Sequence, residues 1–195
     1  MGRIVVSENV TLDEVVQDPA GVEGFERGGW VGRVGERGRA EAAQVLLDEA
    51  LGAEAQVFGR RTYEFLAARW PSRSGELADR LNDMPKYVVS STLKDPEWNN
   101  SQVLSGDVVA EVSKLKGELD GEIVVAGSIR LVRTLMENDL VDQLRLMIYP
   151  VVLGAGERLF GGSGHQRRVR LVETRTVDDL AYLIYDIESS ETSSR

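Results

Sequence analysis

Two guanidinium groups and a hydroxyl follow a glycine in one short segment, Val57-Phe58-Gly59-Arg60-Arg61-Thr62. The apolar residues before Gly59 are typical of a strand, and the segment that begins at Arg60 is typical of the first turns of a helix. A helix N-terminus offers free N–H groups and a partial positive charge, and arginine adds paired donors that suit phosphate oxygens. The segment is therefore a candidate phosphate site, with Gly59, Arg60, Arg61 and Thr62 as its donors. A solvated helix start with ordinary surface arginines is the alternative.

A second strand-glycine-helix junction adds another hydroxyl, in the segment Ala126-Gly127-Ser128-Ile129. Its backbone amides could bind a pyrophosphate, and two such junctions in one sheet favour a dinucleotide. Neither junction carries the G-x-G-x-x-G fingerprint of the Rossmann fold. A G-x-G does occur at Gly154-Ala155-Gly156, but no helical pattern follows it, so a loop is the better interpretation.

The composition excludes several other kinds of chemistry. The chain has 195 residues, no cysteine, one histidine and a net charge of -9. Disulfides, thiolate nucleophiles and structural zinc are excluded, and we expect no metal site. The single histidine, His165, lies among glycines and is interpreted as a surface residue. The acidic balance argues against nucleic acid and anionic membranes as partners.

The length and the hydropathy pattern predict one domain without a membrane segment. No apolar run approaches the roughly 20 residues that cross a bilayer, and the first residues do not resemble a signal peptide. We therefore expect a cytoplasmic protein. A single domain is predicted over residues 1–188, followed by a polar tail over residues 189–195.

Strand and helix patterns alternate through the middle of the chain. Strands are predicted at 3–11, 55–58, 86–91, 123–126 and 142–149, and a hairpin at 168–176 and 180–186. Helices are predicted at 60–65, 108–119 and 129–136, and one more has Ala43, Leu46, Leu47 and Ala50 on its apolar face. Residues 24–38 are rich in glycine and are predicted to form an irregular loop.

This alternation predicts an α/β domain with a central mixed, mostly parallel sheet. Helices should cover both faces of the sheet, and the C-terminal hairpin should add antiparallel strands. Ligands of such sheets collect beyond the carboxyl ends of the strands, where glycine lets the backbone approach them. The two junction glycines, Gly59 and Gly127, are therefore expected to mark the binding site.

Six motifs in a fixed order resemble one known family. They are Val6-Ser7-Glu8-Asn9-Val10-Thr11-Leu12-Asp13, Gly28-Gly29-Trp30, and residues 58–64, 87–92, 125–128 and 144–156. Their order and spacing over nearly the whole chain resemble the dihydrofolate-reductase-like fold. More narrowly, the chain is similar to the stand-alone proteins of the riboflavin-biosynthesis reductase (RibD C-terminal) family. This resemblance implies a three-layer α/β fold, NADPH as hydride donor and, usually, a homodimer.

The resemblance also assigns cofactor-binding roles to residues at the ends of four strands. Gly59, Arg60, Arg61 and Thr62 would hold the 2'-phosphate and the pyrophosphate. The residues that would border the adenosine are Ser90, Ser91 and Thr92, although a polar strand end also explains the two serines. The residues that would close over the pyrophosphate and the nicotinamide ribose are Gly127, Ser128, Ile129, Arg130 and Leu131. Val6 would flank the nicotinamide.

On the substrate side, the resemblance points to the residues that follow the first strand. Asp13 is the candidate catalytic residue, as a hydrogen-bond acceptor for substrate or as part of a proton relay, and a turn-forming aspartate is the alternative. Trp30 could stack on a planar ring or cover the core. The other substrate candidates are Thr11, Val15, Tyr63 and Phe65, although helical spacing favours core positions for the two aromatic residues.

Departures from the family pattern narrow the function. The pathway reductases usually carry Ser-Leu-Asp-Gly where this chain has Thr11-Leu12-Asp13-Glu14, so the backbone freedom of glycine is missing. Dihydrofolate reductases place a carboxylate on the first helix after a Trp-x-Leu-Pro type segment, and no such segment precedes Glu41 or Asp48. The absence of cysteine excludes the zinc deaminase half of the bifunctional riboflavin enzyme.

The sequence therefore predicts an NADPH-dependent reductase that acts on a small heterocyclic or carbonyl substrate. It resembles 5-amino-6-(5-phosphoribosylamino)uracil reductase. Two alternatives stay open, namely dihydrofolate reductase activity and a nucleotide-binding regulatory protein without turnover. The fold alone does not separate them, because one scaffold hosts many functions.

Overall fold

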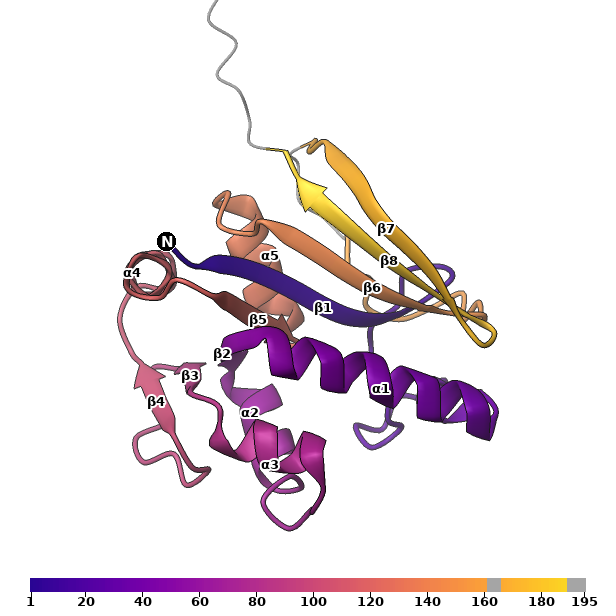
Figure 1. Ribbon diagram of the computed structural model, residues 1–195, viewed down its shortest axis with the longest axis horizontal. Helices are drawn as coiled ribbons and strands as arrows, with labels where there is room; N and C mark the ends of the chain where they lie inside the picture. The colour runs from indigo at the N-terminus through magenta and orange to yellow at the C-terminus, as the bar shows by residue number, and fades with distance from the viewer. Residues whose placement is uncertain (161–165, 189–195) are drawn as a thin grey trace, which may run out of the picture.

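One mixed sheet forms the centre of the protein (Figure 1). In the computed structural model, which describes residues 1–160 and 166–188, eight strands are hydrogen-bonded in the order β4-β3-β2-β5-β1-β6-β8-β7. In chain order the strands are β1 (Arg3–Thr11), β2 (Ala53–Gly59), β3 (Lys86–Val89), β4 (Ser101–Leu104), β5 (Glu122–Ala126), β6 (Gln143–Tyr149), β7 (Val169–Val177) and β8 (Leu180–Ile187). The helices are η1 (Trp30–Arg33), α1 (Glu36–Gly52), α2 (Arg60–Ala67), α3 (Glu76–Asp83), α4 (Val108–Glu118) and α5 (Ile129–Glu137).

The strand directions confirm the predicted mixed, mostly parallel sheet. Strands β1 to β6 are parallel wherever they pair with one another, whereas β8 is antiparallel to both β6 and β7. Parallel neighbours need a long crossover, which the helices of this chain provide, but an antiparallel pair needs only a short turn. The hairpin turn is Asp178-Asp179, and Asp178 adopts the left-handed conformation with φ 55°.

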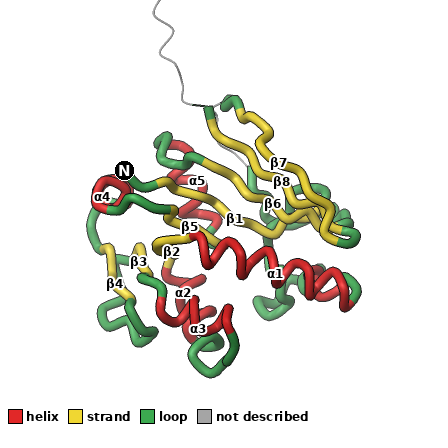
Figure 2. The backbone as a smooth tube through the Cα atoms, in the orientation of Figure 1, coloured by secondary structure: helices red, strands yellow, loops and turns green. Residues whose placement is uncertain are grey.

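Helices cover both faces of the sheet, as Figure 2 shows with helices in red and strands in yellow. Alternate residues of a strand point to opposite faces, so β1 separates the two layers. Val6 and its alternate neighbours pack with α4 and α5 in one core cluster. Val5 packs with residues of α1, α2 and α3 in a second cluster on the other face. A third cluster, around Trp30 and Tyr149, lies where α1 meets β6 and β8.

The first helix differs from its prediction in extent and in its inward face. It begins at Glu36, inside the glycine-rich segment that was predicted to be irregular. Its buried side chains include Val45, Glu49 and Ala50, whereas Leu46 is 38% exposed. Of the predicted apolar face, only Ala50 is buried and Leu47 is half-buried, whereas Ala43 and Leu46 are exposed. The reason is that hydroxyl groups of the sheet lie beneath this helix and take a carboxylate, Glu49, as their partner.

Three elements have no counterpart in the prediction, namely η1, α3 and β4. Strand β4 has four residues and forms the edge of the sheet beside β3, too short for a periodic pattern to identify it. The predicted polar tail over residues 189–195 and His165 both lie outside the described residues.

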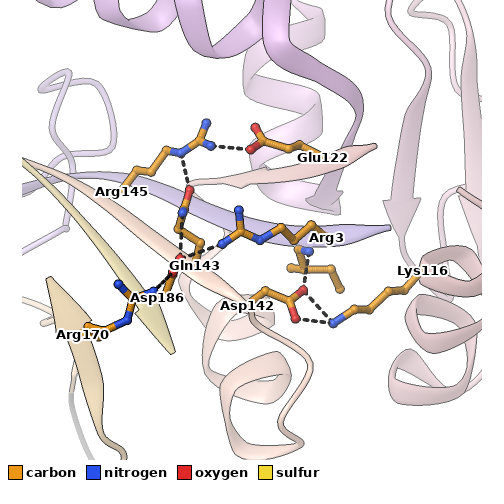
Figure 3. Close-up of polar contacts among 9 residues, drawn as sticks. Arg3, Lys116, Glu122, Asp142, Gln143, Arg145, Arg170 and Asp186 are labelled. Carbon is orange, nitrogen blue, oxygen red and sulfur yellow. Dashed lines mark hydrogen bonds and ion pairs between the residues drawn. The ribbon is translucent and has the colours of Figure 1, made fainter. Parts of the chain in front are cut away.

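Polar contacts join the strands at the amino ends of β1, β5 and β6 (Figure 3). The guanidinium of Arg3 donates to Asp186 Oδ1 at 2.6 Å, and the side-chain amide of Gln143 donates to the same oxygen at 2.9 Å. Arg145 donates to Glu122 Oε1 at 2.6 Å, and its side chain is only 12% exposed. These contacts stabilise the end of the sheet that lies opposite the two junction glycines, where the strands β1, β5 and β6 begin.

Lys86 is a fully buried lysine that organises the connections around β3. Its Nζ donates to the backbone oxygens of Met84 at 2.7 Å, Asn99 at 2.8 Å and Asn82 at 3.0 Å. The same nitrogen lies 4.5 Å from the ring centroid of Trp98. Burial lowers the pKa of Lys86 to about 8, and the charge of nearby Asp83 opposes this effect. The ammonium group therefore uses all three donors on carbonyls of two separate connections.

We expect Lys86→Met to lower the free energy of unfolding by about 2–4 kcal/mol, because buried carbonyl oxygens lose their donor. Urea unfolding at neutral pH measures the change. The matched control is Lys94→Met at an exposed lysine, which should stay within about 0.5 kcal/mol of the wild type. A Lys86→Met protein as stable as this control would contradict the structural role of the ammonium group.

Candidate functional site

The two strand-glycine-helix junctions meet at the carboxyl ends of β2 and β5. These strands are parallel neighbours, and Val57 pairs with Val125, so Gly59 and Gly127 lie at the same level of the sheet. The Gly59 amide donates to Ser128 Oγ at 2.9 Å, and the Ser128 amide donates to Thr62 Oγ1 at 3.0 Å. The two junctions that the sequence analysis singled out therefore form one continuous structure.

The turn between β5 and α5 needs an unusual backbone. Gly127 and Ser128 both have left-handed conformations, with φ values of 62° and 60°. A Cβ atom at Gly127 would lie 3.1 Å from Thr62 Cγ2, so a larger residue there would be strained and crowded. The tight contact with Thr62 brings the N-termini of α2 and α5 together.

Both helices begin without a side-chain cap. Gly59 occupies the cap position of α2 and Ser128 that of α5, and neither makes a side-chain capping hydrogen bond. The first amides of a helix have no partner within the helix, so uncapped ends leave them available to an anion. At α5 these are the amides of three residues predicted to bind cofactor, namely Ile129, Arg130 and Leu131.

Arg60 joins the N-terminus of α2 to the loop after β3. Its Nη1 donates to Thr92 Oγ1 at 2.7 Å, and its Nε donates to Glu64 Oε1 at 2.7 Å. Ser90 Oγ in turn accepts the amide of Thr92 at 3.2 Å, while Ser91 between them is exposed. The structure therefore brings the predicted phosphate and adenosine residues together.

Arg61 points to a different part of the chain. Its guanidinium forms an ion pair with Glu23, and its side chain is 77% exposed. Glu23 belongs to a loop held by the buried carboxylate of Asp18, which accepts the backbone amides of Val22 at 2.7 Å and Glu23 at 3.1 Å. Arg61 therefore links this loop to the N-terminus of α2.

Asp13 lies in a tight turn after β1. Its Oδ1 accepts from Thr11 Oγ1 at 2.7 Å and from the amide of Leu153 at 3.1 Å, and its Oδ2 accepts the amide of Gly154 at 2.8 Å. Desolvation raises the pKa of Asp13, but these hydrogen bonds outweigh it and leave the pKa below its ordinary value. Thr11 also accepts the amide of Val15, and both are fully buried. The carboxylate of Asp13 is therefore an ionised acceptor that fixes the turn.

The aromatic candidates for substrate contact lie mainly in the core. Trp30 is 1% exposed, donates through Nε1 to the Gln17 backbone oxygen at 3.0 Å, and packs edge-on against Tyr149. Tyr63 is 3% exposed, and its hydroxyl accepts the amide of Trp98 at 3.0 Å. Phe65 is half-buried beneath the guanidinium of Arg69. Trp30 and Tyr63 therefore leave no ring face open to a substrate.

Val6 and Glu8 point into the α5 side of the sheet. Val6 is fully buried in the core cluster of that face. Glu8 is only 9% exposed, and its Oε1 has no hydrogen-bond partner in the described part of the chain. Burial raises the pKa of Glu8 to about 8, and a hydrogen bond from the Gly127 backbone acts in the opposite direction. The sequence analysis did not single out Glu8, although a carboxylate between apolar strand residues was a signal of this kind.

A buried polar cluster on the opposite face was also missed. Glu49 on α1 accepts from Ser7 Oγ at 2.7 Å and from the Tyr182 hydroxyl at 2.5 Å. Burial, followed by the charge of Glu49, raises the pKa of Tyr182, so this hydroxyl keeps its proton. Ser7 is only half-buried, and Asn9, two residues later on the same face, is exposed in mid-strand. The cluster therefore lies next to a stretch of β1 whose side chains, from Ser7 to Asn9 on this face, become accessible to solvent.

Metal-binding groups and membrane-spanning helices are both missing from the part of the chain that the structure describes. Within residues 1–160 and 166–188, no group of three or more histidine, aspartate or glutamate side chains is arranged to hold a metal ion. None of the helices in this part of the chain combines the length and the apolar character that crossing a membrane requires.

The amino-acid sequence matches the RibD C-terminal domain over residues 3–182. The chain belongs to the RibD C-terminal domain family. A curated relative is the uncharacterized protein YyaP of Bacillus subtilis (strain 168), with 30% identity over 125 residues. That match covers 62% of this chain and 66% of the relative, slightly less than two thirds of its length.

Solved structures confirm the dihydrofolate-reductase-like fold. A putative riboflavin biosynthesis protein from Shewanella sp. PV-4 has a TM-score of 0.75 at 18% identity, over 96% of this chain and 99% of that chain. Dihydrofolate reductase from Enterococcus faecalis, complexed with NADP(H) and RAB-propyl, has a TM-score of 0.59 at 14% identity, over 96% and 97% of the two chains. RibD of Acinetobacter baumannii has a TM-score of 0.65 at 12% identity, over 97% of this chain and 59% of that chain.

We expect Gly127→Ala to lower the free energy of unfolding by about 1–3 kcal/mol, because the left-handed backbone and the contact with Thr62 both oppose a Cβ atom. Thermal or urea unfolding measures the change. Gly117→Ala is the matched control, since Gly117 lies within α4 and a Cβ there meets nothing within 4 Å. This control should gain about 0.5–1 kcal/mol. Equal effects of the two substitutions would contradict the constraint at Gly127.

Proposed function

We propose that this protein is an NADPH-dependent reductase that transfers a hydride to a small heterocyclic or carbonyl substrate. The observation that carries the proposal is the meeting of two uncapped helix N-termini at Gly59 and Gly127. Membership of the RibD C-terminal family supports a reductase of this type. We propose that the reaction is similar to the one that 5-amino-6-(5-phosphoribosylamino)uracil reductase catalyses.

The residues of the two junctions fit the charged part of NADPH. The first amides of α2 and α5, with Thr62 and Ser128 beside them, would hold the pyrophosphate. Arg60 reaches Thr92 and would place its guanidinium at the 2'-phosphate of the adenosine, bordered by Ser90 and Ser91. The left-handed backbone at Gly127, which glycine adopts without strain, would let the chain approach a phosphate without a Cβ in the way.

The bound cofactor would supply the hydride, and the chain's own residues would position the substrate. The half-buried Ser7 and the exposed Asn9 mark the open side of β1, above the carboxylate of Glu49. Asp13 accepts three hydrogen bonds from the chain, and its pKa is lowered. It is therefore better suited to accept hydrogen bonds and hold the turn in place than to donate a proton. We therefore propose that the proton comes from solvent and that Thr11 and Val15 act through the shape of the turn.

We also propose that the protein is a cytoplasmic homodimer. A groove of about 540 Å³ lies between α5 and the adjacent face of β6, β8 and β7, away from the junctions. Apolar side chains line most of it, among them Phe160 and Val169, which are 44% and 45% exposed. An exposed apolar surface of this kind is typical of a protein interface.

Turnover tests the proposed function directly. Purified protein should consume NADPH in the presence of a panel of heterocyclic and carbonyl substrates that includes the phosphoribosylamino-pyrimidine. Dihydrofolate belongs in the panel because folate reduction was left open. Tight NADPH binding without consumption of any member would instead support a nucleotide-binding regulatory protein.

We expect NADPH to bind more tightly than NADH, and Arg60→Ala to weaken NADPH binding by about 10- to 150-fold while leaving NADH nearly unchanged. A charge-assisted bond to the 2'-phosphate exists only with NADPH, which is why the two cofactors should respond differently. Tryptophan fluorescence titration measures both affinities. Arg61→Ala shows whether the second arginine contributes, and Arg73→Ala, outside the junctions, is the control. Equal wild-type affinities for the two cofactors would remove the phosphate role of these arginines.

We expect Val169→Glu to convert the dimer to a monomer at micromolar concentration, because a charge would be buried in an apolar interface. Light scattering coupled to size-exclusion chromatography measures the mass. The control is Leu51→Glu, at a leucine of similar exposure (52%) on α1. A monomeric wild type would contradict the proposed assembly, and an unchanged dimer in Val169→Glu would place the interface elsewhere.

A further inference from the structure

The carboxyl group of Glu8 lies beside the turn that connects β5 to α5. Ser7 of β1 pairs with Ala126, the last residue of β5, so Glu8 is level with Gly127 (the β1–β5 pair is seen in Figure 1). On its other side Glu8 pairs with Leu146 of β6. The amide of Gly127 is the polar neighbour of the Glu8 carboxyl. The side chain of Glu8, in the buried part of the sheet, therefore contacts the turn that is proposed to bind the pyrophosphate.

The surroundings of Glu8 are otherwise apolar. Val6 and Val10 lie on the same face of β1 and are almost fully buried, and Glu8 itself is 9% exposed. Its Oε1 is a buried oxygen without a hydrogen-bond partner among the residues that the structure describes. Burial of a carboxyl with an unused oxygen favours its neutral form, because the charged form loses its hydration.

No cation within the described ranges compensates this carboxyl. The ionisable side chains carried by the elements packed on this face are Glu111, Lys114, Lys116 and Glu118 of α4, Arg130, Arg133 and Glu137 of α5, Glu157 and Arg158 of the loop before Leu159, Tyr87 of β3 and Tyr185 of β8. None of them forms an ion pair with Glu8. Lys116 pairs with Asp142, and Arg133 pairs with Glu157.

An anion at the Gly127 turn would interact directly with this group. A pyrophosphate held by the amides of the turn would share that turn with the Glu8 carboxyl, which accepts a hydrogen bond from the Gly127 backbone. In a buried environment, solvent and salt screen the repulsion between two negative charges only weakly. Ionisation of Glu8 and binding of the anion should therefore oppose each other, and this coupling is reciprocal.

We propose that Glu8 must be protonated for a pyrophosphate-containing cofactor to bind at full affinity, so that binding takes up a proton whenever Glu8 starts ionised. This inference rests on the proposed function of the two junctions. Glu8 is a positioning residue, since it acts on the cofactor through the Gly127 turn. Its neutral form leaves the turn free of a competing negative charge.

The direction of the pH dependence follows from the pKa of Glu8, which burial raises to about 8. Well below this value the carboxyl is neutral, and affinity should not depend on its titration. As pH rises through about 8 the carboxyl ionises, and affinity should fall. If binding raises the pKa by about one unit, the affinity lost at high pH approaches tenfold.

Isothermal titration calorimetry with NADP⁺ tests the proposal on the full chain. Between about pH 7 and about pH 9.5 the wild-type affinity should fall about tenfold, whereas Glu8→Gln, which mimics the neutral carboxyl, should change less than about threefold. The control Glu118→Gln, at an exposed carboxylate of α4, should retain the wild-type profile. Two buffers of different ionisation enthalpy at about pH 8.5 should show proton uptake in the wild type and much less in Glu8→Gln.

A second measurement does not depend on the variant. NMR titration of glutamate-labelled wild type should show the buried carboxyl signal with a higher pKa in the presence of NADP⁺ than in its absence. The same pH profile in wild type and Glu8→Gln, or a carboxyl pKa unmoved by NADP⁺, would overturn this inference alone. If NADP⁺ binds to neither protein at any pH, the proposed function fails and the inference fails with it.

Discussion

The parallel pairing of β2 with β5 is the constraint on which the site depends. It places Gly59 and Gly127 at one level, although the two glycines lie far apart in the sequence. The hydrogen bonds of Ser128 with Gly59 and Thr62 can form only in this register. A shift by one residue would turn the strand side chains to opposite faces and separate the two helix ends. At the opposite ends of these strands, the ion pair between Arg145 and Glu122 joins β6 to β5 and helps to hold the strands in position.

Strand β1 joins the two sides of the proposed chemistry. Because its residues alternate between faces, Ser7 meets the Glu49 and Tyr182 cluster below α1, while Glu8 faces the layer of α4 and α5. The turn that follows β1 is fixed by Asp13, which accepts amides of the loop after β6. One strand thus carries a hydroxyl toward the proposed substrate side and a carboxyl toward the proposed pyrophosphate turn.

The buried ionisable side chains differ in how completely their polar atoms are hydrogen-bonded. Lys86 satisfies its ammonium group with three carbonyl oxygens, and Glu49 accepts two hydroxyl donors, so each buried group has partners. Glu8 differs because one of its oxygens has none in the described part of the chain. Buried polar groups without partners are costly, and proteins retain them mainly where they serve a function. Three other described residues also carry a buried polar atom without a partner, so the position beside the Gly127 turn is what distinguishes Glu8.

Local sequence determined the strands and helices that surround the site, because apolar periodicity and glycine at strand ends are local signals. The junctions at Gly59 and Gly127 and the terminal hairpin were predicted on this basis and are present. The sequence did not indicate which face of α1 is buried, because that depends on the hydroxyls of Ser7 and Tyr182 beneath it. Helical spacing favoured a core position for Tyr63, but it could not decide between core and substrate for Trp30 or show that Glu8 is buried beside Gly127. Burial and hydrogen bonding between distant residues arise only when the sheet assembles, so the tertiary structure alone decided those roles.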